Sequence, residues 1–206
     1  MNSKVKAAHD DFAQTYDTVC RQVESHAHEI LFGLAYEFVN AKESLLDIGV
    51  GTGLASVLFH KAGLIVYGVD YAEKMLSVCR EKGFVKELKT YDLRLGNWPY
   101  SDGQINHAVC CGVFHFIRDI DVFFRETRRI LQSSGTFSFT TIDKIAGKAS
   151  FMDESGIRIY WYDENDICSL AKTHEFEVLK TVAFYAFKTP AKKEKLLFRG
   201  YTLQKL

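Results

Sequence analysis

The chain has 206 residues, of which 47% are hydrophobic, 14% aromatic and 25% charged. This is the composition of an ordinary globular protein, and it excludes a disordered tail, a collagen-like fibre and a coiled coil. The 26 Lys and Arg residues balance the 26 Asp and Glu residues, so the formal net charge is zero. A zero balance argues against a protein whose whole surface binds nucleic acid or anionic lipid, but it leaves room for a local basic patch.

The five cysteines are odd in number and show no CxxC spacing, which predicts free thiols in a reducing compartment. The first residues contain no apolar core of the signal-peptide type. The longest uncharged apolar stretch, residues 108–117, is too short to span a bilayer. These features predict a cytoplasmic protein with no membrane partner. The histidines lack the spacing of metal ligands, so no metal site is predicted.

Apolar residues recur at helical spacing through residues 1–40, which predicts a helical segment there. From residue 44 onward, short apolar stretches alternate with amphipathic helices. The stretches predict strands at residues 44–48, 64–69, 86–91, 107–113 and 136–142, with helices at 54–62, 72–79 and 120–131. Alternation of this kind predicts a parallel sheet covered by helices on both faces.

A further helix is predicted at residues 163–172, followed by strands at 177–187 and 196–203. A lysine-containing loop with no helical pattern joins these two strands, so we expect them to run antiparallel. The sequence thus predicts an α/β protein with a doubly wound, mostly parallel, seven-stranded sheet whose last strand is antiparallel. No composition shift marks a domain boundary, and residues 1–206 are predicted to form a single domain.

The sharpest local pattern is LLDIGVGTGLASVLF, residues 45–59, in which Gly49, Gly51 and Gly53 lie between a strand and a helix. A sharp turn needs residues that tolerate positive φ, and a ligand close to the backbone needs absent side chains. The carboxyl end of a parallel strand is where an open α/β sheet binds ligands. A glycine turn without a ligand has the same local pattern, so this motif alone leaves both interpretations open.

Asp70 ends the next strand, 21 residues after Gly49. A carboxylate there can accept hydrogen bonds from both hydroxyls of a ribose. The alternative is that Asp70 caps the helix beginning near Ala72. Together, the glycine turn and Asp70 have the spacing of one nucleoside that lies across two adjacent strand ends.

Asp47 bears on which nucleoside this is. The dinucleotide fingerprint G-x-G-x-x-G would place its third glycine at Leu54, but the glycine comes one residue early, at Gly53. Asp47 precedes the turn, where a carboxylate would repel a pyrophosphate and attract an ammonium group. The pattern favours a cationic, phosphate-free ligand such as S-adenosylmethionine.

The segments DIGVGTG (47–53), VDYAEKML (69–76), INHAVCCGVFHFI (105–117) and DIDVFFRETRRILQSSGTFSFT (119–140) resemble successive motifs of the class I S-adenosylmethionine-dependent methyltransferases. FAQTYD (12–17) resembles that family's N-terminal segment, whose tyrosine covers the cofactor. The likeness covers about residues 9–142 and is closest to small, stand-alone members. It implies a Rossmann-like fold with a helical lid at 1–40, a cofactor-binding core at 44–142 and a C-terminal helix and strand hairpin at 143–206.

The resemblance implies that the cofactor is held by Tyr16, Asp47, Gly49, Val50, Gly51, Asp70, Tyr71, Met75, Asp92, Leu93 and Cys111. The glycine turn would lie against the methionine part and the ribose, with Asp47 near the amino group. Asp70 would bind the ribose hydroxyls, and Asp92 would accept a hydrogen bond from the adenine amino group. Tyr16 would belong to the lid.

Methyl transfer from an activated donor depends mainly on positioning, and a base is needed only where the acceptor must lose a proton. His115, just beyond the fourth predicted strand, is the candidate base. A histidine that merely shapes the cavity wall is the alternative. The sequence offers Arg158, Tyr160, Trp161 and Tyr162 as further cavity residues, although the aromatic three could equally be packing residues.

The sequence therefore predicts a methyltransferase that converts S-adenosylmethionine to S-adenosylhomocysteine and methylates an O, N or C atom of a small molecule. We expect a monomer or a homodimer. The lysines and arginines after residue 188 read as a solvated loop, so nucleic acid is not expected to be a partner. Two alternatives stay open: an NAD(P)-dependent oxidoreductase, and a non-catalytic protein that binds S-adenosylmethionine.

Overall fold

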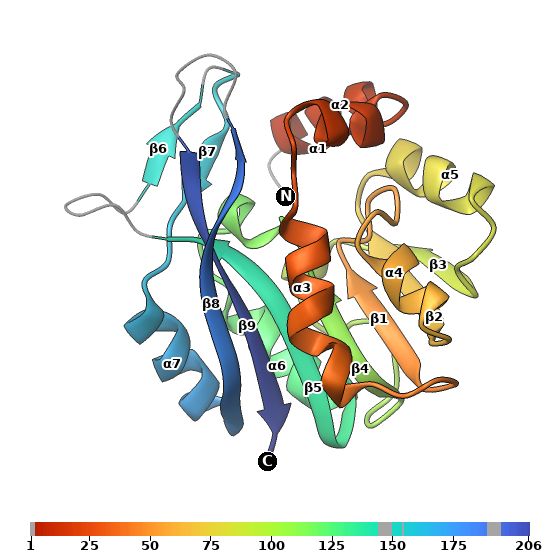
Figure 1. The fold of residues 1–206 in the computed structure, drawn as a ribbon, viewed down its shortest axis with the longest axis vertical. Helices are drawn as coiled ribbons and strands as arrows, with labels where there is room; N and C mark the ends of the chain where they lie inside the picture. The colour runs from red at the N-terminus through yellow and green to blue at the C-terminus, as the bar shows by residue number, and fades with distance from the viewer. Residues whose placement is uncertain (1–2, 144–149, 154, 189–194) are drawn as a thin grey trace.

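The computed structural model describes residues 3–143, 150–153, 155–188 and 195–206. Its centre is a seven-stranded sheet with the strand order β3-β2-β1-β4-β5-β9-β8 (Figure 1). The strands are β1 (Ser44–Ile48), β2 (Ile65–Asp70), β3 (Glu87–Thr90), β4 (Ile105–Cys110), β5 (Leu131–Ile142), β8 (Phe176–Lys188) and β9 (Lys195–Lys205).

Strands β1 to β5 pair in parallel, whereas β9 runs antiparallel between β5 and β8. This confirms the predicted doubly wound α/β fold with an antiparallel last strand. The strand order reverses at β1, which lies between β2 and β4. Ligands of open α/β sheets bind at such a switch point.

Seven α-helices and three short 3₁₀ turns accompany these strands in the described ranges. The helices are α1 (Ser3–Phe12), α2 (Tyr16–Gln22), α3 (Ala27–Ala35), α4 (Ser56–Lys61), α5 (Glu73–Glu81), α6 (Asp121–Ile130) and α7 (Glu164–Thr173). The 3₁₀ turns are η1 (Tyr36–Phe38), η2 (Leu93–Leu95) and η3 (Phe114–Phe116). None of the helices described is long and apolar enough to cross a membrane.

Helices cover both faces of the sheet because neighbouring side chains on a strand point to opposite faces. Leu45 packs in a cluster with Leu31 of α3 and Phe59 of α4, whereas Leu46 packs in a cluster with Phe123 of α6. All five side chains are fully buried. Burial on both faces explains why the strand sequences read as continuous apolar stretches rather than as alternating ones.

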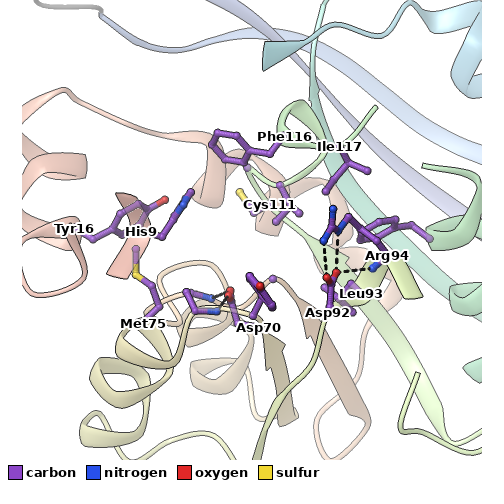
Figure 2. A pocket seen from close by; sticks show the side chains of 17 residues that line it. His9, Tyr16, Asp70, Met75, Asp92, Leu93, Arg94, Cys111, Phe116 and Ile117 are labelled. Atoms are coloured by element: carbon purple, nitrogen blue, oxygen red, sulfur yellow. Dashed lines mark hydrogen bonds and ion pairs between the residues drawn. The ribbon is translucent and has the colours of Figure 1, made fainter. Parts of the chain in front are cut away.

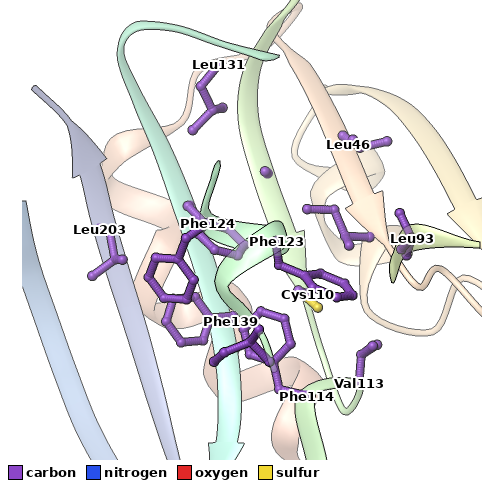
Figure 3. Close-up of a cluster of buried hydrophobic side chains, with 14 of the residues drawn as sticks. Leu46, Leu93, Cys110, Val113, Phe114, Phe123, Phe124, Leu131, Phe139 and Leu203 are labelled. Carbon is purple, nitrogen blue, oxygen red and sulfur yellow. The ribbon is translucent and has the colours of Figure 1, made fainter. Parts of the chain in front are cut away.

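The cluster on the α6 face is rich in phenylalanine (Figure 3). Phe114 of η3 is completely buried, and its ring lies 5.3 Å from that of Phe123 in an edge-to-face arrangement. Aromatic pairs of this geometry add about 0.5–1.5 kcal/mol beyond their buried area. The cluster therefore fixes the segment that follows β4 against α6, and this segment forms part of the site described below.

The structure differs from the sequence prediction at the end of β4. The strand stops at Cys110 instead of continuing to residue 113, and the backbone N–H of Gly112 donates to the Thr140 hydroxyl at 3.0 Å. The Thr140 hydroxyl thus accepts a hydrogen bond that a backbone carbonyl of the neighbouring strand would accept if β4 continued. Two short strands that were not predicted, β6 (Ser150–Met152) and β7 (Arg158–Tyr160), form a separate antiparallel pair. Most of the predicted lysine-containing loop, 189–194, lies outside the described residues.

Candidate functional site

Two adjoining cavities open where β1, β2 and β4 end, with residues of α1 and α2 in their walls, and Figure 2 shows the residues that line the first of them. We call them the narrow cavity, of about 60 Å³, and the larger cavity, of about 340 Å³. They share seven lining residues and so form one continuous site: His9, Tyr16, Gly49, Gly51, Cys111, Gly112 and Phe116. The site lies at the switch point of the sheet.

The eleven residues assigned to the cofactor from the sequence, together with His115, all line this site. Nine line the narrow cavity: Tyr16, Gly49, Gly51, Asp70, Tyr71, Met75, Asp92, Leu93 and Cys111. Asp47, Val50 and His115 line the larger one. The structure thus brings them together from α2, α5, β1, the glycine turn and the ends of β2, β3 and β4.

The glycine turn has the backbone that its sequence predicts. Gly49 and Gly51 have φ values of +75° and +53°, which residues with a side chain rarely adopt. A Cβ at Gly49 would come within 2.4 Å of Val113, so the turn packs tightly there. A Cβ at Gly51 would meet no atom within 4 Å, because this residue faces the cavity. The turn therefore leaves open space beside Gly51, on the side of the cavity.

Asp70 joins the end of β2 to this turn. One carboxylate oxygen accepts a hydrogen bond from the Gly51 N–H at 2.8 Å, and the other accepts one from the Ala72 N–H, also at 2.8 Å. Burial raises the pKa of Asp70 in spite of these two bonds, which favour the charged form. The predicted bond to the start of the next helix is therefore present, and the same carboxylate also lines the narrow cavity.

Asp47 is the most unusual polar group of the site. It lies on β1 between Gly68 and Val109, its exposed fraction is 2%, and Oδ2 has no hydrogen-bond partner among the described residues. Burial raises the pKa of this carboxyl to about 7. Hydrogen bonds from Ser56 lower this pKa but do not outweigh burial, and a buried carboxylate is costly unless a positive group approaches it. The charge and place of Asp47 suit an ammonium group in the larger cavity.

Asp92 is held by a residue that the sequence analysis did not nominate. Arg94 donates from Nε to Oδ1 at 3.0 Å and from Nη2 to Oδ2 at 2.6 Å. These bonds lower the pKa of Asp92 to about 2, so the carboxylate is ionised at all physiological pH values. Arg94 itself lines the narrow cavity. A ligand amino group at Asp92 would share the carboxylate with this guanidinium.

His115 lies in the larger cavity, where a base for the acceptor could act. Its ring packs on Phe116 with centroids 4.1 Å apart, and Nδ1 is buried without a hydrogen-bond partner in the described structure. Burial lowers the pKa of His115 to about 3. A group that gains a proton only near pH 3 is a poor proton acceptor at neutral pH. The geometry favours a wall residue over a base.

Helices α1 and α2, the predicted lid, contribute two residues that the sequence analysis missed. His9 of α1 lines both cavities. Asp17 of α2 accepts a hydrogen bond from the Thr52 hydroxyl at 2.6 Å and pairs with Lys82 at 2.5 Å. Asp17 therefore connects the lid to both the glycine turn and the end of α5. The polar run HDDFAQTYD is the only sequence signal for these contacts.

Four further candidates from the sequence lie outside the two cavities, and for the three aromatic ones packing was the stated alternative. Arg158, Tyr160, Trp161 and Tyr162 are absent from the walls of both cavities. Trp161 is buried against Phe151, and the Tyr162 hydroxyl donates to the carbonyl of Ile117. Tyr162 thus supports the segment after β4 from outside the cavities. The described residues also contain no group of three or more His, Cys, Asp or Glu side chains that could hold a metal.

Comparison with known proteins agrees with this geometry. Residues 46–139 match the family model described as a methyltransferase domain. A malonyl-[acyl-carrier protein] O-methyltransferase from Legionella pneumophila is 24% identical over 147 residues, which cover 69% of this chain and 51% of that protein. A demethylmenaquinone methyltransferase from Tropheryma whipplei is 27% identical over 97 residues, covering 47% and 41%. The chain thus matches about half the length of these curated relatives, or less.

Solved structures share the fold. The 1,6-didemethyltoxoflavin-N1-methyltransferase of Burkholderia thailandensis, solved with bound 1,6-didemethyltoxoflavin and S-adenosylhomocysteine, has a TM-score of 0.74 at 14% identity, and the alignment covers 100% of this chain and 91% of that one. A methyltransferase structure from Methanosarcina mazei has a TM-score of 0.72 at 17% identity, covering 83% and 96%. The family match over residues 46–139, the relatives and the shared fold together support a class I S-adenosylmethionine-dependent methyltransferase.

Proposed function

We propose that the protein is an S-adenosylmethionine-dependent methyltransferase that acts on an O, N or C atom of a small molecule. The observation that carries this proposal is the buried carboxylate of Asp47 beside the glycine turn, whose Oδ2 has no hydrogen-bond partner among the described residues. An ammonium group in the cavity would supply its missing partner, whereas a pyrophosphate would be repelled. This supports the methyltransferase over the nicotinamide oxidoreductase, the alternative that the early third glycine already disfavours.

The residues present fit this cofactor in three places. Asp47 would bind its amino group, and the open space at Gly51 would admit the part of the cofactor that lies against the backbone. Asp70 would bind the ribose hydroxyls with the lone pairs that remain after it accepts its two hydrogen bonds from the backbone. Tyr71, Met75 and Leu93 would pack against the adenine in the narrow cavity, near Asp92. Val50, Tyr16 and the backbone at Cys111 would complete the enclosure.

When bound, S-adenosylmethionine supplies an activated methyl group. The task left to this chain is to orient the acceptor and to exclude water, which can contribute several kcal/mol, up to about 10, to lowering the barrier. The lid serves this purpose because α1 and α2 cover the site and Asp17 holds α2 to the glycine turn. The larger cavity is then the place for the acceptor.

The relatives support the reaction more than they support any one acceptor. Their names give malonyl-[acyl-carrier protein] and demethylmenaquinone as substrates, and the Burkholderia protein is named for an N-methylation. We therefore propose a small acceptor from the shape of the site and take none of these as the substrate.

Calorimetry with S-adenosylhomocysteine tests the proposal, together with a fluorescence titration with reduced nicotinamide adenine dinucleotide. We expect binding of the former at micromolar concentration and none of the latter. Binding of the dinucleotide alone would favour the oxidoreductase. Tight binding of S-adenosylhomocysteine, with no methylation across a broad panel of acceptors, would favour the non-catalytic binder.

A further inference from the structure

The larger cavity has an almost uncharged wall. Asp47 is its one carboxylate, and no Lys or Arg is among the described residues that line it. The remaining wall is mainly apolar and includes Phe12, Val19, Phe116 and Phe198. A bound carboxylate or phosphate would find no cation there. If Asp47 is taken by the cofactor, as the proposed function requires, this cavity suits an uncharged, largely apolar acceptor.

His9 presents a hydrogen-bond acceptor at the junction of the two cavities. Its Nδ1 lies 2.7 Å from the carbonyl oxygen of Val5, one helical turn earlier in α1. A carbonyl oxygen can only accept, so Nδ1 carries the hydrogen. In the neutral ring, Nε2 therefore carries the lone pair. The ring stands edge-on to Phe116 at 5.2 Å between centroids, and Nε2 has no hydrogen-bond partner among the described residues.

The other two histidines of the larger cavity are less suitable. Burial lowers the pKa of His115 to about 3 and also lowers the pKa of His28. His28 lies 3.6 Å from Glu29 and reaches the cavity from α3. Of the three, His9 alone has its tautomer fixed by a backbone carbonyl. The ionisable groups that interact with His9 from other elements are Asp70, at the end of β2, and His115, on η3.

We propose that Nε2 of His9 accepts the proton of an uncharged O–H or N–H acceptor bound in the larger cavity. This inference rests on the proposed function. The acceptor atom forms its new bond to the methyl carbon, the carbon–sulfur bond breaks with its electron pair left on sulfur, and the acceptor's proton passes to Nε2. The resulting imidazolium is stabilised by Asp70 nearby and releases its proton to water when the product leaves.

A matched set of three probes tests the binding part: 4-methylphenol, 4-methylanisole and 4-methylbenzoate. Each is titrated by calorimetry into the protein saturated with S-adenosylhomocysteine. We expect the phenol to bind at least tenfold more tightly than its methyl ether, which lacks the proton, and the benzoate not to bind. Equal affinity for phenol and ether, a preference for the benzoate, or no binding of any probe would overturn the inference.

The variant His9→Phe keeps a ring against Phe116 and removes the lone pair. It should abolish the preference for the phenol over the ether and leave S-adenosylhomocysteine affinity within about threefold of the parent. His26→Phe is the control, because His26 is largely exposed and lines neither cavity. It should keep the parent's preference. A phenol preference that survives in His9→Phe contradicts the inference.

One measurement addresses the proton directly. Nitrogen NMR of histidine-labelled protein should show His9 as the Nδ1–H tautomer, and an Nε2–H tautomer would refute the assignment. If the parent fails to bind S-adenosylhomocysteine, the proposed function itself is wrong. Normal cofactor binding without phenol selectivity removes only the role of His9.

Discussion

The carboxylate of Asp70 accepts a hydrogen bond from the backbone N–H of Gly51 at 2.8 Å, which connects the end of β2 to the turn that follows β1. The other oxygen is held by the Ala72 N–H at the same distance. The carboxylate is therefore fixed in place by the protein's own backbone, and it lines the narrow cavity. A ligand that uses it need not first order the side chain, so little conformational entropy is lost there on binding.

Asp70→Ala should weaken S-adenosylhomocysteine binding by about 1.5 to 3 kcal/mol, the scale of lost charge-assisted hydrogen bonds. It should also lower the free energy of unfolding by about 1 kcal/mol, because the Gly51 and Ala72 N–H groups lose their acceptor. Calorimetry and urea unfolding measure the two effects. Asp166→Ala, at an exposed carboxyl of α7 outside the site, is the control and should change neither quantity appreciably. Parent-like binding by Asp70→Ala would show that the ribose is placed wrongly.

Asp47→Asn should weaken cofactor binding and stabilise the ligand-free protein. Burial raises the pKa of Asp47 from its usual value of 3.8 to about 7, so the free energy of unfolding of the parent falls as the pH rises from about 4 to about 7. The amide does not titrate, so the ligand-free variant should become the more stable protein by about 2 to 4 kcal/mol at pH 8. At that pH it should bind S-adenosylhomocysteine at least tenfold more weakly. Urea unfolding at pH 4.5 and 8 tests the direction of this change. The prediction is wrong if the stability of the variant relative to the parent falls as the pH rises.

Gly51→Ala and Gly83→Ala form a matched pair. Both glycines have positive φ, +53° and +70°, and an added Cβ would meet no atom within 4 Å at either position. Each substitution should therefore cost a similar backbone strain, about 1 to 2 kcal/mol of unfolding free energy. Only Gly51 lines the cavities, so only Gly51→Ala should weaken S-adenosylhomocysteine binding, by tenfold or more. Equal binding by the two variants would mean that the ligand does not lie against the turn.

Asp17→Ala should loosen the lid. Asp17 connects α2 to Thr52 and Lys82, and with these contacts gone the lid should open more readily. We expect S-adenosylhomocysteine to dissociate about three- to tenfold faster in stopped-flow experiments, with a smaller change in the association rate. Asp11→Ala is the control in the same segment, because Asp11 is 80% exposed and pairs only loosely with Lys74 at 3.8 Å. Unchanged dissociation in Asp17→Ala would exclude a gating role for this contact.

The sequence predicts the parts of the fold that local patterns determine. β1 is found at Ser44–Ile48, as predicted, because its apolar run is bounded by the glycine turn. The end of β4 is predicted at the wrong residue because it depends on the hydrogen bond from Gly112 to Thr140, which joins residues far apart in the sequence. Strands β6 and β7 have three residues each, too few for a recognisable alternation.

The same division holds for the site. Asp47, Gly51 and Asp70 are predictable because strand ends and a glycine turn place them locally. His9 and Arg94 are not, since each reaches the cavity only through the packing of its segment on the rest of the chain. For His9 the decisive fact is which ring nitrogen donates a hydrogen bond to the Val5 carbonyl. This depends on side-chain geometry that residue spacing does not reveal.

Helix α3 packs on β9 so closely that a Cβ at Gly200 would lie 2.6 Å from Leu34. A ribosome makes residues 27–35 long before residues 195–205. During translation α3 is therefore made long before the strand that packs against it. The antiparallel strands β8 and β9 can complete the sheet only after residue 205 has left the exit tunnel. Contacts over such sequence distances slow folding and prolong the exposure of apolar surface. We therefore expect nascent chains that stop before β9 to depend on chaperones, even though they already contain the whole glycine turn.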